Sequence, residues 1–425
     1  MGLHGHTKHG EVLRLERKKR RGEVIHLILF FITIVYAYIS EGSKNYYERD
    51  IYLVVRIEGD IQIENDRNFV KVRVLESEID EIQGRKALLI SRNLHLENQG
   101  IYQLFGSVRV NKGKVYIYSY GDSLAYLGEE KNVRTWLIEN YSRLTKNEEV
   151  KSLGFSFLFG EPRDTAPPSL QKSFLSTGLV HLLVISGLHV GLIAGIVMKS
   201  LPKFWGMRVA LLLIIMYSIL IVPQEPPVLR ATLMFSMFIL SALSFQEVNR
   251  LAVLFFSGSV ILFVFPNYVL SYSFWLSFFA TLYILLALEY QTKSKFKKSL
   301  VVSVSAFGGV APLIASFSYI SPLSVLFTPI MAPVVVLYAT LGVLSLISFM
   351  KFSLIVYLFN VIGVIFIKVV NIAEFFSFQI YLDVKAFEGF IIVTLCALIM
   401  YLADKNYKPW VPIASIGYLF IRSLI

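Results

Sequence analysis

The chain has 425 residues, of which 55% are hydrophobic, 14% aromatic and only 17% charged, and its mean hydropathy is +0.60. This composition predicts a membrane protein with many spans. The single cysteine, Cys396, excludes an intramolecular disulfide and a thiolate metal cluster. Most of the net charge of +11 flanks apolar segments, so it indicates membrane topology rather than a nucleic-acid-binding surface.

The N-terminus predicts a membrane anchor with a basic flank. Residues 1–23 form a basic tail, and the apolar residues 24–40 are just long enough to span a bilayer. The end of this run lacks the small-x-small cleavage pattern of a signal peptide, which favours a retained anchor. The basic flank predicts a cytoplasmic N-terminus.

Residues 41–125 change character, because short alternating runs separated by turns predict a small all-β domain. Five such runs suit an OB-type barrel, although another small barrel or a sandwich fits as well. Basic and aromatic residues that could bind DNA gather around one predicted hairpin: Arg109, Lys112, Lys114, Tyr116 and Tyr118. A packed strand face explains the alternating tyrosines equally simply and is the favoured interpretation.

Residues 126–177 predict a helix followed by an interfacial loop, and residues 178–425 predict a continuous multi-span membrane domain. Ten spans are expected there, which makes about 11 with the anchor: 178–200, 206–222, 229–245, 251–265, 269–290, 299–318, 323–349, 352–377, 389–403 and 411–425. Strict alternation places eleven lysines and arginines in cytoplasmic loops and two outside. This bias predicts that the β domain and the C-terminus are extracytoplasmic.

The segment 178–200 is unusually polar for a membrane span. It contains His181, Ser186 and His189, and polar groups at such depth usually face a bundle interior or a water-filled path. On a continuous helix Ser186 and His189 would lie about 60° apart, on one face. Glycines at every fourth position predict close packing against a neighbouring helix: Gly187, Gly191 and Gly195.

Arg230 follows a proline pair, Pro226 and Pro227, which predicts a re-entrant or broken helix with an arginine at depth. Such an arginine could attract phosphate. Alternatively, it reaches the outer interface or pairs with Glu225.

The residues of segment 178–200 resemble the signature of the ComEC family of competence proteins. The pattern of a glycine, then His-Leu-Leu, then Ser-Gly-Leu-His-Val is matched by Gly178, His181, Leu182, Leu183, Ser186, Gly187, Leu188, His189 and Val190. VLRATLM around Arg230 and SFWLSFFAT around Ser277 resemble two further elements of the family, with Ser273 in place of a glycine. The resemblance covers roughly residues 50–425.

The resemblance implies a channel that passes single-stranded DNA across the cytoplasmic membrane during natural transformation. The motif residues implied for its pore are His181, Ser186, Gly187, His189, Arg230 and Ser277. It also implies a lipid bilayer, a cytosolic ATPase and an outer DNA receptor as partners, and a homo-oligomer is possible. Many members carry a metallo-β-lactamase-like domain after the spans, and this sequence ends at Ile425, so we expect a form without it.

No cofactor, metal or catalytic centre is expected. His4, His6 and His9 are spaced like the HxHxDH metal motif, but Lys8 stands where that motif has aspartate, so a histidine-rich tail is favoured. The chain lacks the GxxxxGK[ST] phosphate loop of many ATPases.

Two other functions remain open. A membrane-embedded hydrolase would use Ser186 as nucleophile with His189 or His181 as base, but no orienting acid is identifiable. A small-solute transporter would also use intramembrane glycines, prolines and charges. In the simplest case the histidines and the serine only form hydrogen bonds between helices.

Overall fold

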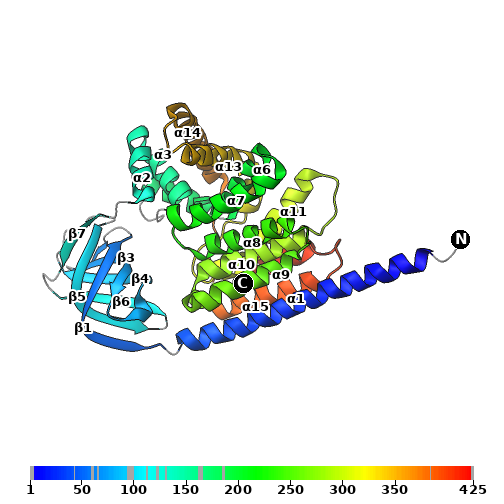
Figure 1. Cartoon of the computed structure of the whole chain (residues 1–425), viewed down its shortest axis with the longest axis horizontal. Helices are drawn as coiled ribbons and strands as arrows, with labels where there is room; N and C mark the ends of the chain where they lie inside the picture. The colour runs from blue at the N-terminus through cyan, green and yellow to red at the C-terminus, as the bar shows by residue number, and fades with distance from the viewer. Residues whose placement is uncertain are drawn as a thin grey trace.

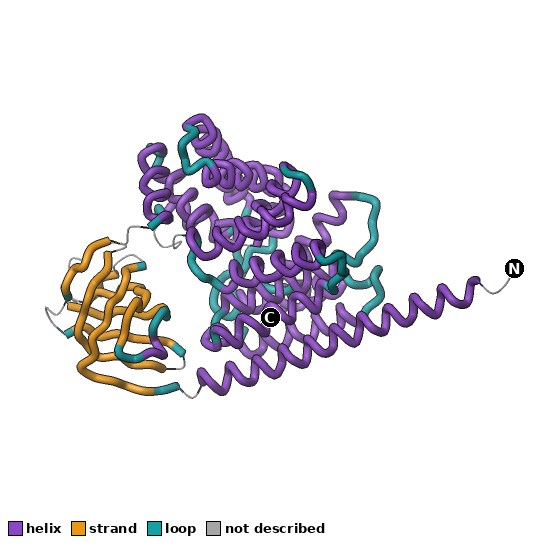
Figure 2. The backbone as a smooth tube through the Cα atoms, in the orientation of Figure 1, coloured by secondary structure: helices purple, strands orange, loops and turns teal. Residues whose placement is uncertain are grey.

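The computed structural model describes residues 4–42, 44–58, 62–64, 67–92, 100–111, 113–120, 124–129, 132–160, 166–183, 187–382 and 384–422. Within these residues the protein has a small β barrel and a larger helical domain. Helix α1 (His4–Gly42) runs along the helical domain and ends beside the barrel (Figures 1 and 2).

The barrel is a closed ring of five strands. Strand β1 (Tyr46–Ile57) pairs with β3 (Arg67–Ser77) on one side and with β5 (Gly100–Asn111) on the other. The ring continues through β4 (Lys86–Arg92) and β6 (Lys114–Ser119), which pair in parallel. These five strands are the five alternating runs of the sequence. Two short strands were not expected: β2 (Gln62–Glu64) and β7 (Ala125–Glu129).

Alternation along the strands builds the barrel core. In β1, Ile51, Leu53, Val55 and Ile57 are buried while the residues between them face outward. Before this run, Asp50 has a φ of 60° and the pairing with β5 shifts register. This irregularity separates the exposed start of β1 from the part that lines the core.

The helical domain contains six helical segments long and apolar enough to cross a membrane, among the residues described, and the chain is therefore a membrane protein. They are Gly22–Glu41 of α1, Lys203–Ile221, Pro226–Leu243, Lys295–Ile314, Ser324–Ile347 and Ser353–Phe376. Five further helices are apolar but shorter: His189–Ser200, Arg250–Val264, Tyr272–Ala287, Ala386–Leu402 and Trp410–Arg422.

The remaining bounds complete the domain. The first half contains α2 (Val133–Leu144), α3 (Glu148–Gly154), the π-helix η2 (Phe155–Phe159), α4 (Pro168–Ser176), α5 (Val180–Leu183), α6 (Gly187–Ser200), α7 (Lys203–Met216) and the π-helix η4 (Tyr217–Ile221). The second half contains α8 (Pro226–Leu243), α9 (Arg250–Val264), the 3₁₀ helix η5 (Pro266–Leu270), α10 (Tyr272–Ala287), α11 (Lys295–Gly308), α12 (Ala311–Ile314), α13 (Ser324–Ile347), α14 (Ser353–Phe376), α15 (Ala386–Leu402) and α16 (Trp410–Arg422).

Several predicted segments are organised differently. Within the expected span 178–200, the described residues include α5, with four residues, and α6, with 14 residues. At 1.5 Å per residue α6 is about 21 Å long, which is shorter than the hydrocarbon core. The expected break at the proline pair is absent, because Pro226 starts the continuous helix α8 and the first turn tolerates proline. Helices α3 and α4 lie where a loop was expected.

The helical domain contains two large hydrophobic cores, and α8 contributes to both. The first bundle packs α2–α7 against α13 and α14, and the second packs α1 against α9, α10 and α15. Val228, Ala231 and Ile239 of α8 belong to the first core, whereas Met234 belongs to the second. In Figure 1 α8 lies between the two groups of helices.

Candidate functional site

Arg230 lies in α8 at the seam of the two bundles. Its side chain is only 8% exposed. Nε donates a 2.9 Å hydrogen bond to Ser277 Oγ of α10, and Nη1 contacts the hydroxyl of Thr281, one turn further along the same helix. None of the described carboxylates forms an ion pair with Arg230. Of the alternatives for Arg230, pairing with Glu225 is wrong, because Glu225 contacts Lys86 instead.

The start of α6 approaches Arg230 from the first bundle. A Cβ placed on Gly187 would lie 3.2 Å from Ala231 Cβ and 3.7 Å from Nη2 of Arg230. Three of the motif residues, Gly187, Arg230 and Ser277, thus come together. This meeting of α6, α8 and α10 is called the seam site below.

The three glycines of α6 differ in their surroundings. A Cβ on Gly191 would lie 2.8 Å from Cζ of Phe235 in α8, which is closer than side chains pack. A Cβ on Gly195 would meet nothing within 4 Å, so Gly195 is not part of the close contact that the sequence predicted. The close approach of α6 to α8 depends on Gly187 and Gly191.

Gly191→Ala is expected to destabilise the protein by about 1–3 kcal/mol, because the ring of Phe235 must move to make room. Gly195→Ala is the matched control and should be neutral or stabilising, by up to about 1 kcal/mol, since alanine favours the helix. Thermal unfolding in detergent measures both changes. Equal melting temperatures for the two variants would contradict the packing described here.

The two histidines do not reach the seam site. His189 is 2% exposed and packs edge-on against Phe157 in the first core, with ring centroids 4.2 Å apart. His181 lies on α5, is exposed, and its Nδ1 is 3.2 Å from the carbonyl oxygen of Gly178. Ser186 falls outside the described residues.

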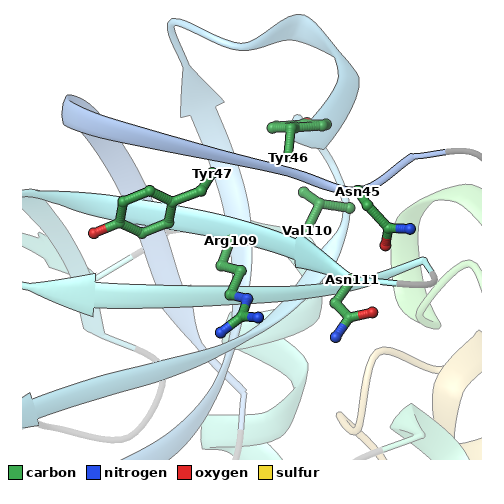
Figure 3. Close-up of a pocket in the computed structure, with 6 residues that line it drawn as sticks. All are labelled: Asn45, Tyr46, Tyr47, Arg109, Val110 and Asn111. Atoms are coloured by element: carbon green, nitrogen blue, oxygen red, sulfur yellow. The ribbon is translucent and has the colours of Figure 1, made fainter.

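On the barrel, Arg109 lies directly opposite Tyr47 of β1 and Tyr116 of β6. Arg109 and Tyr47 line an open pocket of about 300 Å³ together with Asn45, Tyr46, Val110 and Asn111 (Figure 3). Tyr116 and Tyr118 are half-buried and Lys114 is exposed. Lys112 lies outside the described residues.

A second aromatic cluster was missed in the sequence. Tyr52 and Phe105 have ring centroids 4.6 Å apart, and Tyr120 packs edge-on against Phe105 at 5.9 Å. Tyr52 is 55% exposed and Tyr120 is 38% exposed. The three rings come from separate parts of the chain, β1, β5 and the end of β6, so only strand pairing reveals the cluster.

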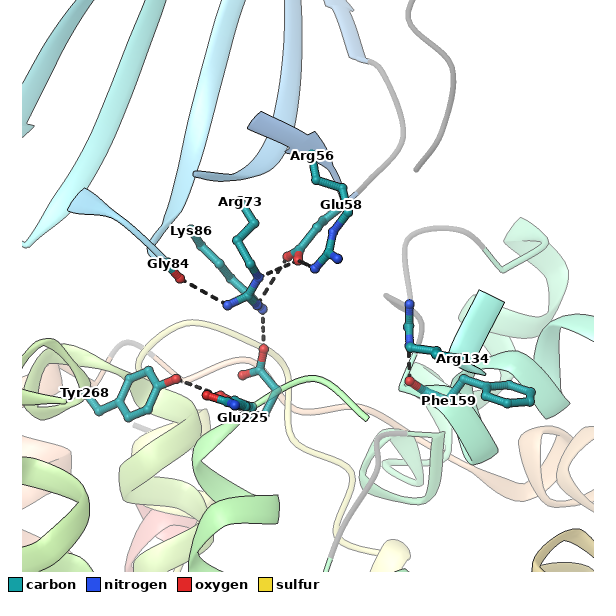
Figure 4. A network of polar contacts seen from close by, with 10 residues as sticks. Arg56, Glu58, Arg73, Gly84, Lys86, Arg134, Phe159, Glu225 and Tyr268 are labelled. Carbon is teal, nitrogen blue, oxygen red and sulfur yellow. Dashed lines mark hydrogen bonds and ion pairs between the residues drawn. The ribbon is translucent and has the colours of Figure 1, made fainter. Parts of the chain in front are cut away.

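Polar contacts join the barrel to the helical domain (Figure 4). Lys86 of β4 forms an ion pair with Glu225, the residue before α8. Burial and the negative charge of Glu225 raise the pKa of Tyr268 to about 12, so its hydroxyl remains protonated and donates a 2.7 Å hydrogen bond to the carbonyl oxygen of Gln224. The same face of the barrel holds Glu58, whose carboxylate accepts a 2.6 Å bond from Nε of Arg73.

The Arg73–Glu58 pair gives a prediction for pH. Burial alone raises the pKa of Glu58, but the charge and hydrogen bonds of Arg73, together with the charges of Lys86 and Arg56, lower it by more, so the pKa lies below its ordinary value. A carboxyl with a lowered pKa stabilises the fold above the pKa of the unfolded chain, about 4.3, and this contribution disappears as the pH falls through the folded pKa. Glu58→Gln should therefore lower the melting temperature at pH 7, and the difference from the unaltered protein should shrink as the pH falls below about 4. A difference independent of pH would contradict the ion pair.

Comparison with known proteins places this arrangement in a family. The family model described as Competence protein matches residues 157–406. An uncharacterised protein of Aquifex aeolicus (strain VF5) is 41% identical over 406 residues, which cover 95% of this chain and 98% of that protein. ComE operon protein 3 of Bacillus subtilis (strain 168) is 29% identical over 185 residues, which cover 41% of this chain and 24% of that protein. No solved structure matches.

The family match contains the whole seam site, since Gly187, Arg230, Ser277 and Thr281 all lie within residues 157–406. It covers more than half of the sequence, and the resemblance carried by segment 178–200 is thereby confirmed. The chain belongs to the competence protein family.

Proposed function

We propose that this protein passes single-stranded DNA across the cytoplasmic membrane, along a path that includes the seam site. The observation that carries the proposal is Arg230: a buried cation between two helical bundles, which none of the described carboxylates neutralises. A buried charge without a counter-charge is costly, and a passing phosphodiester supplies one. Membership of the competence protein family supports a role in DNA uptake.

The seam also meets the physical needs of a conduit. A polyanion requires a polar or positive lining that does not hold it tightly. Ser277 and Thr281 already accept hydrogen bonds from the Arg230 guanidinium. A phosphate could therefore bond only the remaining N–H groups and would not be held tightly. Next to these groups α6 starts at Gly187, whose missing side chain leaves room beside Arg230.

The barrel is assigned to the OB type and to first contact with DNA. An OB-type barrel is a ring of five strands that contains one parallel pair, and here that pair is β4 and β6. The exposed rings of Tyr52 and Tyr120 offer surfaces on which bases stack without sequence readout. Arg109, beside the pocket of Figure 3, offers a cation to the backbone.

The N-terminus is assigned to the cytoplasm, and the barrel and C-terminus to the outside, because of the basic flank of α1 and the loop charges. A cytosolic ATPase and an outer receptor would drive and deliver the strand. The protein is proposed to act as a conduit rather than an enzyme. In support, His189, a candidate base of the hydrolase alternative, packs against Phe157 inside the first core.

The test uses the full chain reconstituted into vesicles. Labelled oligothymidylate added outside should become resistant to external nuclease, whereas a duplex of the same length should not. Equal protection by protein-free vesicles would contradict the conduit. Ser186→Ala separates the alternatives, because a hydrolase would lose essentially all activity and a conduit would keep most of its uptake.

A further inference from the structure

Three cations lie side by side on the barrel where it meets the helical domain. Arg56 of β1 is paired directly with Arg73 of β3, and Arg73 is paired directly with Lys86 of β4. All three face outward, because their neighbours along the strands, such as Val55, Val72 and Ala87, are buried. Lys114 is the first residue of β6, and the next residue, Val115, is paired with Ala87. Because β4 and β6 are parallel, Lys114 lies beside Lys86 and extends the row. These four residues are called the basic row.

The basic row is unfavourable for the barrel alone. Like charges directly opposite each other on neighbouring strands repel, and a sheet selected only for stability would avoid them. Among the described residues, two carboxylates contact the row: Glu58, which bonds Arg56 and Arg73, and Glu225, which reaches Lys86 from the helical domain. Within this part of the chain the row carries more positive charge than the two carboxylates supply negative charge.

The two carboxylates are held differently. The side chains of Arg73 and Glu58 are 17% and 18% exposed, and their paired hydrogen bonds of 2.6 and 3.4 Å fix them. Lys86 and Glu225 are 58% and 29% exposed. An exposed pair contributes at most about 1 kcal/mol, so a phosphate can replace Glu225 beside Lys86 at little cost.

The row lies close to the seam site. Glu225 immediately precedes α8, and Arg230 follows five residues later, about 7.5 Å along the helix axis. The hairpin beside Lys114 also touches the helical domain, since a Cβ on Gly113 would lie 2.6 Å from Cδ1 of Leu270.

We propose that the basic row binds the phosphodiester backbone of single-stranded DNA as it passes from the barrel to the seam, and that Glu225 holds Lys86 until a phosphate replaces it. The proposal rests on the conduit function and specifies where the strand enters. Glu225 acts as a counter-ion that keeps the empty entry site neutralised and lowers its affinity.

The test measures binding of fluorescent oligothymidylate to the full chain in lipid nanodiscs. Lys86→Gln should weaken binding roughly five- to tenfold and reduce the slope of log affinity against log salt by about 0.7, as expected for one lost phosphate contact on a single strand. Glu225→Gln should strengthen binding, because the competitor of the phosphate is gone. Lys146→Gln, at an exposed lysine after α2, is the charge-matched control and should change neither affinity nor slope.

A thiol cross-link between Lys86→Cys and Glu225→Cys reports the contact itself, formed with a short bis-maleimide because side chains that meet at their tips lie too far apart at Cα for a direct disulfide. In a Cys396→Ala background no other cysteine is present, so the reagent should join the two positions, and oligothymidylate should slow the reaction. The proposal is overturned if Lys86→Gln and Glu225→Gln both behave like Lys146→Gln, or if DNA leaves the cross-linking rate unchanged. If these results appear as predicted but vesicles take up no DNA, the entry site stands and the conduit function fails.

Discussion

Arg230→Gln is expected to reduce DNA uptake by roughly tenfold or more, as hydrogen bonds to a charged group contribute about 1.5–3 kcal/mol. Stability should change in the opposite sense. The guanidinium is buried without a carboxylate partner among the described residues, so removing its charge should leave the melting temperature unchanged or raise it. Uptake by cells and thermal unfolding of the purified protein measure the two effects.

Two variants sharpen this test. Arg230→Lys keeps the charge but not the planar fork that reaches Ser277 and Thr281, and it should recover part of the uptake. Arg208→Gln removes an exposed arginine of α7 that lies over the ring of Phe204, and it should leave uptake nearly unchanged. If Arg230→Gln lowered stability and uptake together while Arg230→Lys restored neither, the role of Arg230 would be structural.

Glu41→Gln is expected to have the largest effect on stability, a loss of about 3–5 kcal/mol. Glu41 lies in the last turn of α1 and is fully buried, and its carboxylate accepts hydrogen bonds of 2.7 and 2.9 Å from Arg85, which lies between β3 and β4. Lys44 adds a third contact at 3.2 Å. Removing the carboxylate leaves the charge of Arg85 without its partner at the junction of anchor and barrel. Chemical or thermal unfolding in detergent measures the loss.

The control for Glu41 is Glu81, which lies 3.7 Å from the same Lys44 but is 53% exposed. Glu81→Gln should cost less than about 1 kcal/mol, because exposed ion pairs contribute little. The double variant Glu41→Leu with Arg85→Leu should be less destabilised than the sum of the single changes, since no charge is then left unpaired. Additive losses would show that the two side chains do not interact.

The sequence alone predicted the barrel strands well. Strands β1, β3, β4, β5 and β6 have one apolar and one polar face, so alternation locates them without further information. Strands β2 and β7 were missed because three and five residues are too short for a clear pattern. Backbone pairing with β3 and β5 holds these two segments as strands, although their own residues show no strand pattern.

Membrane helices give weaker signals. Lipid and protein core are both apolar, so hydropathy locates a helix but does not show which face meets a neighbour. The sharing of α8 by two cores is invisible in the sequence for this reason. Proline is an equally ambiguous sequence signal, because it can start a helix or break one, and Pro226 starts α8.

The sequence by itself determined that the protein has a membrane anchor, a small β domain and many spans, and its segment 178–200 determined the family. Only the tertiary structure decided what the functional residues contact. In it Arg230 contacts Ser277 and Thr281, and His189 is buried in the first core. Arg56, Arg73 and Lys86 lie side by side on three strands. The physical reason is that periodicity fixes the faces of a segment, whereas contacts between segments distant in sequence depend on how those faces pack.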